Sequence, residues 1–89
     1  MALYQPLDTI RDGSLKATIW KRETENRPFY SVELTRSYTD QDGKWHDASS
    51  FVGDELLRIA RLAQLAYDET LYHRQKDREA TAPNDGRRT

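Results

Sequence analysis

The sequence feature that most constrains the fold is a long helical segment in the second half of the chain. Residues 54–74 carry apolar side chains at helical spacing, and Asp54 and Glu55 suit the positive N-terminal end of a helix. One arc of about 120° on a helical wheel holds the side chains expected to pack on a sheet: Leu56, Ile59, Ala60, Ala63, Ala66, Tyr67 and Leu71. The first half of the chain must supply that sheet.

Four segments before the helix have the alternation typical of strands: residues 7–11, 14–22, 29–38 and 44–52. Asp12-Gly13 predicts a type I′ hairpin turn, and a second turn is expected at residues 40–43. In the second strand, Leu15, Ala17 and Ile19 share the natural core face. The sequence therefore predicts an α+β fold, a four-stranded antiparallel meander followed by one long C-terminal helix packed on one sheet face.

Composition sets the expected domain limits and surroundings. The domain is expected over residues 7–75, between an N-terminal arm (1–6) and a disordered tail (76–89) in which apolar residues vanish. The chain has no apolar run long enough for a membrane span and no signal-peptide pattern, which predicts a cytoplasmic protein without a membrane partner. Because it also lacks cysteine, this small domain is expected to gain stability by self-association.

No pattern in the sequence carries a catalytic signature. It lacks a glycine-rich phosphate loop, a nucleophile elbow, and HExxH or CxxC spacing. His46 beside Trp45 is interpreted as a surface residue, and Asp40, Asp42 and Asp47 as turn residues rather than calcium ligands. We therefore expect a non-enzymatic protein without a cofactor or metal.

The non-core face of the sheet combines cations with aromatic rings. Because phosphates meet cations and bases stack on rings, this pattern favours binding of single-stranded DNA or RNA, although the net charge of −1 gives no global attraction. The alternative is a cross-strand pair of Trp20 and Phe29 covered by basic side-chain stems. The residues expected to bind nucleic acid are Lys16, Trp20, Arg22, Phe29 and Arg36.

A second apolar surface is expected on the helix. Leu57, Leu62 and Leu65 lie outside the core arc and are interpreted as a two-fold homodimer interface, or alternatively as exposed leucines of a monomer. The alternative function is a protein–protein interaction or assembly module, whose partner docks on this helix margin or on a free sheet edge.

The element order, four short antiparallel strands and one long helix over about residues 9–70, resembles the single-stranded-DNA-binding transcriptional coactivator fold. That resemblance implies pairing through the helix and a basic, aromatic sheet that binds single strands. The runs Thr9–Trp20, Pro28–Val32 and Ser50-Phe51 ahead of Leu56-Leu57 are similar to small bacterial proteins of uncharacterised function, which implies a bacterial source.

Overall fold

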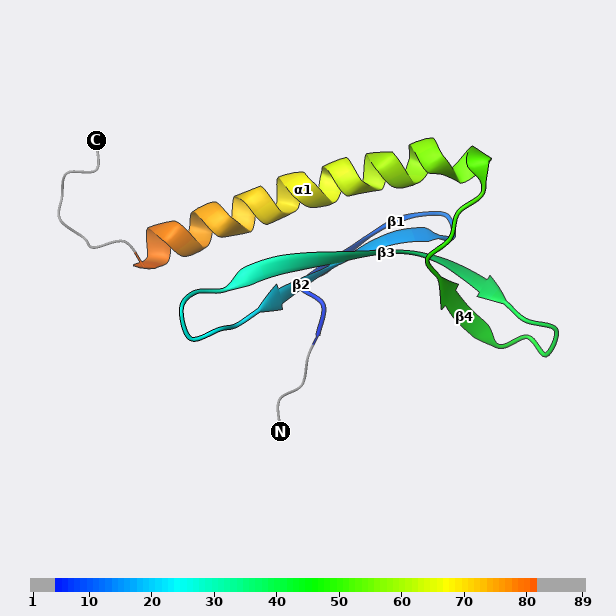
Figure 1. The fold of residues 1–89 in the computed structure, drawn as a ribbon, viewed down its shortest axis with the longest axis horizontal. Coiled ribbons are helices and arrows are strands. Elements are labelled where there is room, and N and C mark those ends of the chain that lie inside the picture. The colour runs from blue at the N-terminus through cyan, green and yellow to red at the C-terminus, as the bar shows by residue number, and fades with distance from the viewer. Residues whose placement is uncertain (1–4, 82–89) are drawn as a thin grey trace.

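The computed structural model describes residues 5–81 and confirms the α+β architecture. Four strands, β1 (Asp8–Asp12), β2 (Leu15–Arg22), β3 (Phe29–Thr39) and β4 (Trp45–Ala48), precede one helix, α1 (Gly53–Thr81). The strands form one antiparallel sheet in the order β1-β2-β3-β4. Helix α1 lies along one face of this sheet, and no helix or strand of the described residues covers the opposite face (Figure 1).

The core lies between α1 and the middle of the sheet, as the alternation in β2 predicts. Leu15, Ala17 and Ile19 are completely buried and pack against Ile59, Leu62 and Ala66 of the helix. Val32 and Leu34, which oppose Ile19 and Ala17 across the β2–β3 ladder, are only partly buried at the margin of this cluster. The core is therefore small and leaves the outer edge of β3 thinly covered.

The β1–β2 turn differs from the predicted one. Asp12 pairs with Leu15, so Gly13 and Ser14 are the two central residues of the turn. Only Gly13 has a positive φ, of 62°. A glycine with positive φ at the first central position is the pattern of a type II′ turn, whereas type I′ needs two such residues. The hairpin prediction is confirmed, but its turn type and its central residues were wrong.

The second turn is organised by Asp40, as its sequence predicts. The Asp40 Oδ1 atom accepts backbone hydrogen bonds from Asp42 and Lys44, both at 2.9 Å, and Gly43 has a φ of 80°. A side chain that accepts from the backbone two residues later is the Asx-turn arrangement. This geometry confirms the turn interpretation of residues 40–43.

Helix α1 is longer than predicted. The Glu55 carboxylate accepts a hydrogen bond from the Val52 backbone N–H at 3.0 Å, half of a capping box that fixes the start. The helix continues to Thr81, where a tail was predicted from residue 76. Asp77 accepts hydrogen bonds from Lys21 and Tyr30, which ties this end to the sheet. The predicted tail is wrong for residues 76–81, and the rest lies outside the described residues.

The face of α1 that packs on the sheet is rotated from the predicted arc. Ile59 and Ala66 are buried as expected, but Leu56 and Tyr67 are 53% and 58% exposed. Buried or half-buried positions continue instead through Leu62, Glu69, Thr70 and His73. The sheet, rather than the mean direction of the apolar side chains, selects the face that is buried. Within the described residues, α1 is too polar to cross a bilayer.

Candidate functional site

The open face of the sheet is the side opposite α1. Side chains on one face of an antiparallel sheet alternate along each strand and align across the ladders. The register therefore places on this face aromatic rings, cations, two acids and several hydroxyls: Thr9, Arg11, Lys16, Thr18, Trp20, Arg22, Phe29, Ser31, Glu33, Thr35, Ser37, Thr39, Trp45 and Asp47. We call this set the open face.

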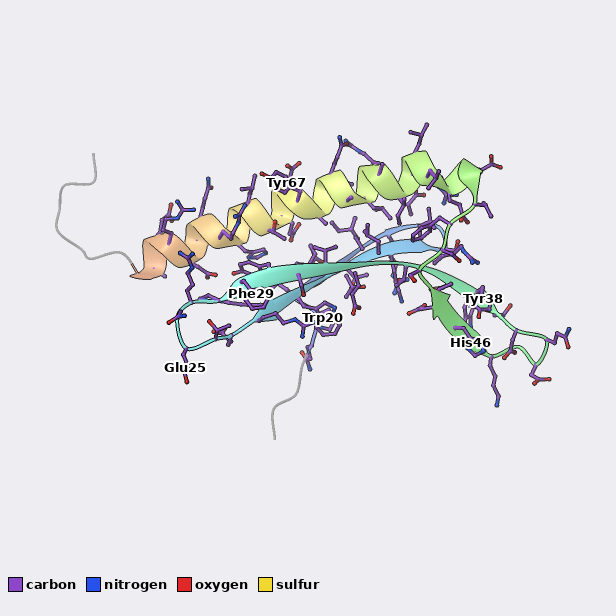
Figure 2. All side chains as sticks on the ribbon, in the orientation of Figure 1. Trp20, Glu25, Phe29, Tyr38, His46 and Tyr67 are labelled. Carbon is purple, nitrogen blue, oxygen red and sulfur yellow. The ribbon has the colours of Figure 1, made fainter. Side chains whose placement is uncertain are left out.

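Trp20 and Arg22 form a contact pair on the open face, near its Phe29 end. The Arg22 guanidinium lies 5.5 Å from the centroid of the Trp20 ring and its Nε donates to the Ser31 hydroxyl at 3.1 Å. The Trp20 indole N–H donates to Glu33 at 3.2 Å. Figure 2 shows Trp20 projecting from the sheet on the side away from α1. Glu33 therefore binds the N–H edge of the Trp20 indole, while the Arg22 guanidinium lies over the face of the ring.

A shallow depression of about 680 Å³ lies on the open face, at the end where the β1–β2 turn and β4 are found. Its lining includes Arg11, Lys16, Trp45 and Asp47. Lys16 Nζ lies 3.2 Å from Asp47, whose other carboxylate oxygen accepts a hydrogen bond from Ser37 at 3.0 Å. These two contacts, the hydroxyl first, lower the pKa of Asp47. The depression therefore combines one neutralised cation with the exposed cation of Arg11.

The exposed rings of the open face lie at its two ends. Trp45 is 73% exposed on β4, and Phe29 is 51% exposed at the start of β3. Thr39, the partner of Trp45, lies ten positions after Phe29 on β3, a span of about 33 Å. The face therefore carries three rings and three cations along its length, with the Trp20–Arg22 pair beside Phe29 at one end and Trp45 at the other.

The structure brings together four of the five predicted nucleic-acid residues. Lys16, Trp20, Arg22 and Phe29 share the open face. Arg36 was predicted to join them, but it pairs with Leu15 across the ladder and so faces the helix. Its Nε donates to the Ser50 carbonyl and lies 3.7 Å from Glu55. The prediction for Arg36 is wrong, because an even-numbered residue of β3 shares the core face.

The sequence prediction missed Arg11 and Trp45. Arg11 shares the open face because it pairs directly with Lys16. Trp45 joins through β4, whose pairing with β3 begins at Thr39. Strand alternation could have revealed both residues, but only once the registers of β1 and β4 were known.

The three helix leucines do not form one surface. Leu62 is 2% exposed and belongs to the core, and Leu65 is half-buried against it. Leu57 alone is freely exposed, at 84%. The predicted dimer interface of Leu57, Leu62 and Leu65 is therefore wrong as a single patch, because the sheet already covers two of its members.

His46 lies on the helix side of β4 and contacts two side chains, those of Asp40 and Tyr38. Its Nε2 lies 2.7 Å from Asp40 Oδ2, and its ring stacks on Tyr38 at 5.4 Å between centroids. Figure 2 shows Tyr38 and His46 side by side on the β3–β4 hairpin. The contact with His46 is the largest cause of the lowered pKa of Asp40. Across residues 5–81, no three histidine or acidic side chains gather as metal ligands.

Comparison with known proteins found no relative of this chain. No family model, no curated protein and no solved structure matches the chain significantly. The resemblances to the coactivator fold and to small bacterial proteins therefore stay predictions, and the open face is the feature from which a function can be inferred.

Proposed function

We propose that the protein binds single-stranded nucleic acid on the open face of its sheet. The observation that carries this proposal is the interleaving of three aromatic rings, Trp20, Phe29 and Trp45, with the cations Arg11, Lys16 and Arg22 on a face that no described element covers. Single strands are held by such surfaces because cations meet phosphates and unpaired bases stack on rings.

The two exposed rings, Phe29 and Trp45, are expected to contribute more to stacking in this proposed interaction than Trp20 does. Trp45 and Phe29 are more than half exposed, so bases can stack on them without displacing protein contacts. Arg22 already lies over Trp20 and holds that ring in place. A guanidinium plane is itself a surface on which bases stack. The Trp20–Arg22 pair would therefore act as a preorganised contact next to Phe29, at the opposite end of the face from Trp45.

The electrostatic contribution is expected to be modest. Of the cations on the open face, Lys16 is paired with Asp47, and Glu33 lies beside Trp20. The chain as a whole has a net charge of −1. Binding would therefore depend on stacking more than on charge, with a shallow salt dependence and little sequence preference.

Fluorescence anisotropy with labelled oligothymidine and oligouridine at low salt tests the proposal. We expect Trp45→Ala to weaken binding by roughly 5- to 150-fold, the range of about 1–3 kcal/mol per stacked base. Lys16→Ala should weaken it less and reduce the slope of log K against log salt by about 0.7.

The matched controls lie on the exposed side of the helix. Tyr72→Ala removes a ring that is 57% exposed on α1, and Arg61→Ala removes an exposed cation there. Both should bind like the wild type. Absence of binding at tens of micromolar protein, or equal weakening by Trp45→Ala and Tyr72→Ala, would contradict the proposal.

A further inference from the structure

The outer edge of β3 is only partly used by the fold. β4 pairs with β3 from Arg36 to Thr39, and no strand of residues 5–81 pairs with the outer edge of residues 29–35. Unpaired strand edges are templates for pairing with another chain. We call this stretch the β3 window.

The backbone groups that face outward in the window follow from the ladder. The Ser37 N–H donates to the carbonyl of Ser14, the turn residue that immediately precedes β2. In an antiparallel pair, successive residues direct their backbone groups to opposite sides. The odd-numbered residues of β3 therefore face β2, and the N–H and C=O groups of Tyr30, Val32 and Leu34 face outward.

The opposite edge of the sheet is protected, which makes the window unusual within this fold. By the same alternation, Thr9 and Arg11 direct their backbone groups outward from β1. The Thr9 N–H already donates to the Asp8 carboxylate at 2.8 Å. This edge is short and carries Asp8, Arg11 and Asp12, the kind of charged edge that resists pairing.

We propose that the β3 window pairs with the β3 window of a second copy, antiparallel and with Val32 opposite Val32. In this register Tyr30 opposes Leu34 of the partner, and Phe29 opposes Thr35. The three outward-facing residues of each copy would exchange six backbone hydrogen bonds. The two sheets would join into one, and the inference does not depend on nucleic-acid binding.

The length of the window favours a second copy over an unrelated peptide. In this register Pro28 of one copy falls opposite Arg36 of the other. Proline has no N–H to give to a ladder, and Arg36 is the residue at which the chain's own β4 begins to pair. The segment between Pro28 and Arg36 is thus centred on Val32, and it matches the β3 window of a second copy over its whole length.

The side chains of the window are also self-complementary. On the helix side, Tyr30, Val32 and Leu34 would extend the apolar rows of the two cores into each other. On the open face, Glu33 would oppose the hydroxyl of Ser31. No residue of the window meets a like charge directly opposite, an arrangement that would destabilise a ladder.

An exposed stripe of the helix borders the same edge. Arg58 binds Asp12, and Glu69 lies close to Asp8, so this margin of α1 faces β1. On the helical wheel, the opposite margin, toward β3, carries residues with helical spacing: Leu56, Ala60, Ala63 and Tyr67. Leu56 and Tyr67 are more than half exposed. A joined sheet would give this stripe an apolar partner.

The dimensions of the joined sheet suit these large side chains. Helix α1 packs mainly on β2, so two helices would lie three strand spacings apart, about 14 Å. That exceeds the 8–10 Å of direct helix packing, and the groove between them needs bulky side chains. Along α1, Glu55 lies near Arg36 and Asp77 near Tyr30. Tyr67 therefore lies close to the two-fold axis.

Cysteine cross-linking tests the register, because the natural chain has no cysteine. In Val32→Cys the two cysteines would oppose each other with Cα atoms about 5.5 Å apart, within disulfide range. In Leu34→Cys they would lie four residues out of register, about 13 Å apart. We expect a disulfide dimer from Val32→Cys under mild oxidation and none from Leu34→Cys.

Sedimentation tests the helix stripe with a matched pair of substitutions. Tyr67→Glu places two carboxylates near the axis and should shift the wild-type dimer to a monomer. Tyr72→Glu, at an equally exposed tyrosine on the far side of α1, should remain a dimer. A wild type that is monomeric at the highest soluble concentration and yields no Val32→Cys disulfide would overturn the proposal. Equal cross-linking of both cysteine variants would overturn the register.

Discussion

Asp12 and Arg58 form a two-pronged contact that joins the β1–β2 turn to the N-terminal part of α1. The Asp12 carboxylate accepts from Arg58 Nε at 3.1 Å and from Nη2 at 3.2 Å, and its backbone carbonyl accepts from Nη2 at 2.9 Å. These residues lie 46 positions apart in the chain. Together with the Asp77 contacts at the other end, they fix how α1 lies across the sheet.

The first prediction concerns the pH dependence of this contact. The hydrogen bond to Arg58 lowers the pKa of Asp12 below its ordinary value of 3.8. A lowered pKa stabilises the fold above the unfolded-state pKa, and this contribution disappears as the pH falls through the lowered value. Asp12→Asn should reduce Tm at pH 7, and the difference from the wild type should shrink as the pH falls below 3.8 through the lowered pKa. Thermal melts across this range, with Asp42→Asn as control, provide the measurement.

The second prediction compares three glycines. A Cβ on Gly13 would lie 2.8 Å from Arg58 Nη2, and the φ of 62° is unfavourable for alanine. Gly13→Ala and Gly43→Ala should each destabilise the fold by about 1–2 kcal/mol, the cost of placing an L-residue at positive φ. Gly13→Ala should cost more than Gly43→Ala, because it also disturbs the Arg58 contact. Gly53→Ala, which meets neither problem, should be neutral. If Arg58→Ala does not remove the difference between Gly13→Ala and Gly43→Ala, the clash is not its cause.

The third prediction separates the helix leucines. Leu62→Ala should cost about 2–5 kcal/mol of unfolding free energy, because Leu62 is buried in the core and its removal leaves a cavity. Leu57→Ala should change it by less than about 0.5 kcal/mol, as for an exposed side chain. Urea denaturation of both variants measures the contrast. Similar losses in the two would contradict the burial of Leu62.

The fourth prediction concerns the far end of the helix. Burial, and then the hydrogen bond to Asp77, raise the pKa of Tyr30 to about 12. Because a raised pKa favours the protonated side chain in the folded state, this contact stabilises below pH 10 and is lost as the pH rises toward 12. Ultraviolet titration of Tyr30→Phe should lack the last tyrosine to ionise. Asp77→Asn should lower that pKa and speed hydrogen exchange in residues 76–81.

The fifth prediction concerns charge on the open face. Glu33→Gln keeps an oxygen to accept from the Trp20 N–H and removes the acid beside the ring. Binding of single strands should become several-fold tighter at low salt, and the gain should shrink as salt increases. Glu79→Gln makes the same charge change on exposed helix and should leave affinity unchanged. A uniform gain in both variants would indicate net charge rather than the open face.

Strand alternation, turn residues and helical periodicity determined the architecture of this protein from its sequence. They placed Leu15, Ala17 and Ile19 in the core and put Lys16, Trp20 and Phe29 together on the other face, because a period of two is set locally by the backbone. The same local rules identified the turn at Asp40 and the start of α1.

Only the tertiary structure decided what depends on pairing between distant segments. The registers of β1 and β4 added Arg11 and Trp45 to the open face. The contact of Arg58 with Asp12 turns one margin of α1 toward β1, and in this orientation Leu62 enters the core while Leu56 and Tyr67 stay exposed. A helical wheel gives the relative directions of side chains, but the rotation of the helix on its sheet depends on contacts that no local pattern contains.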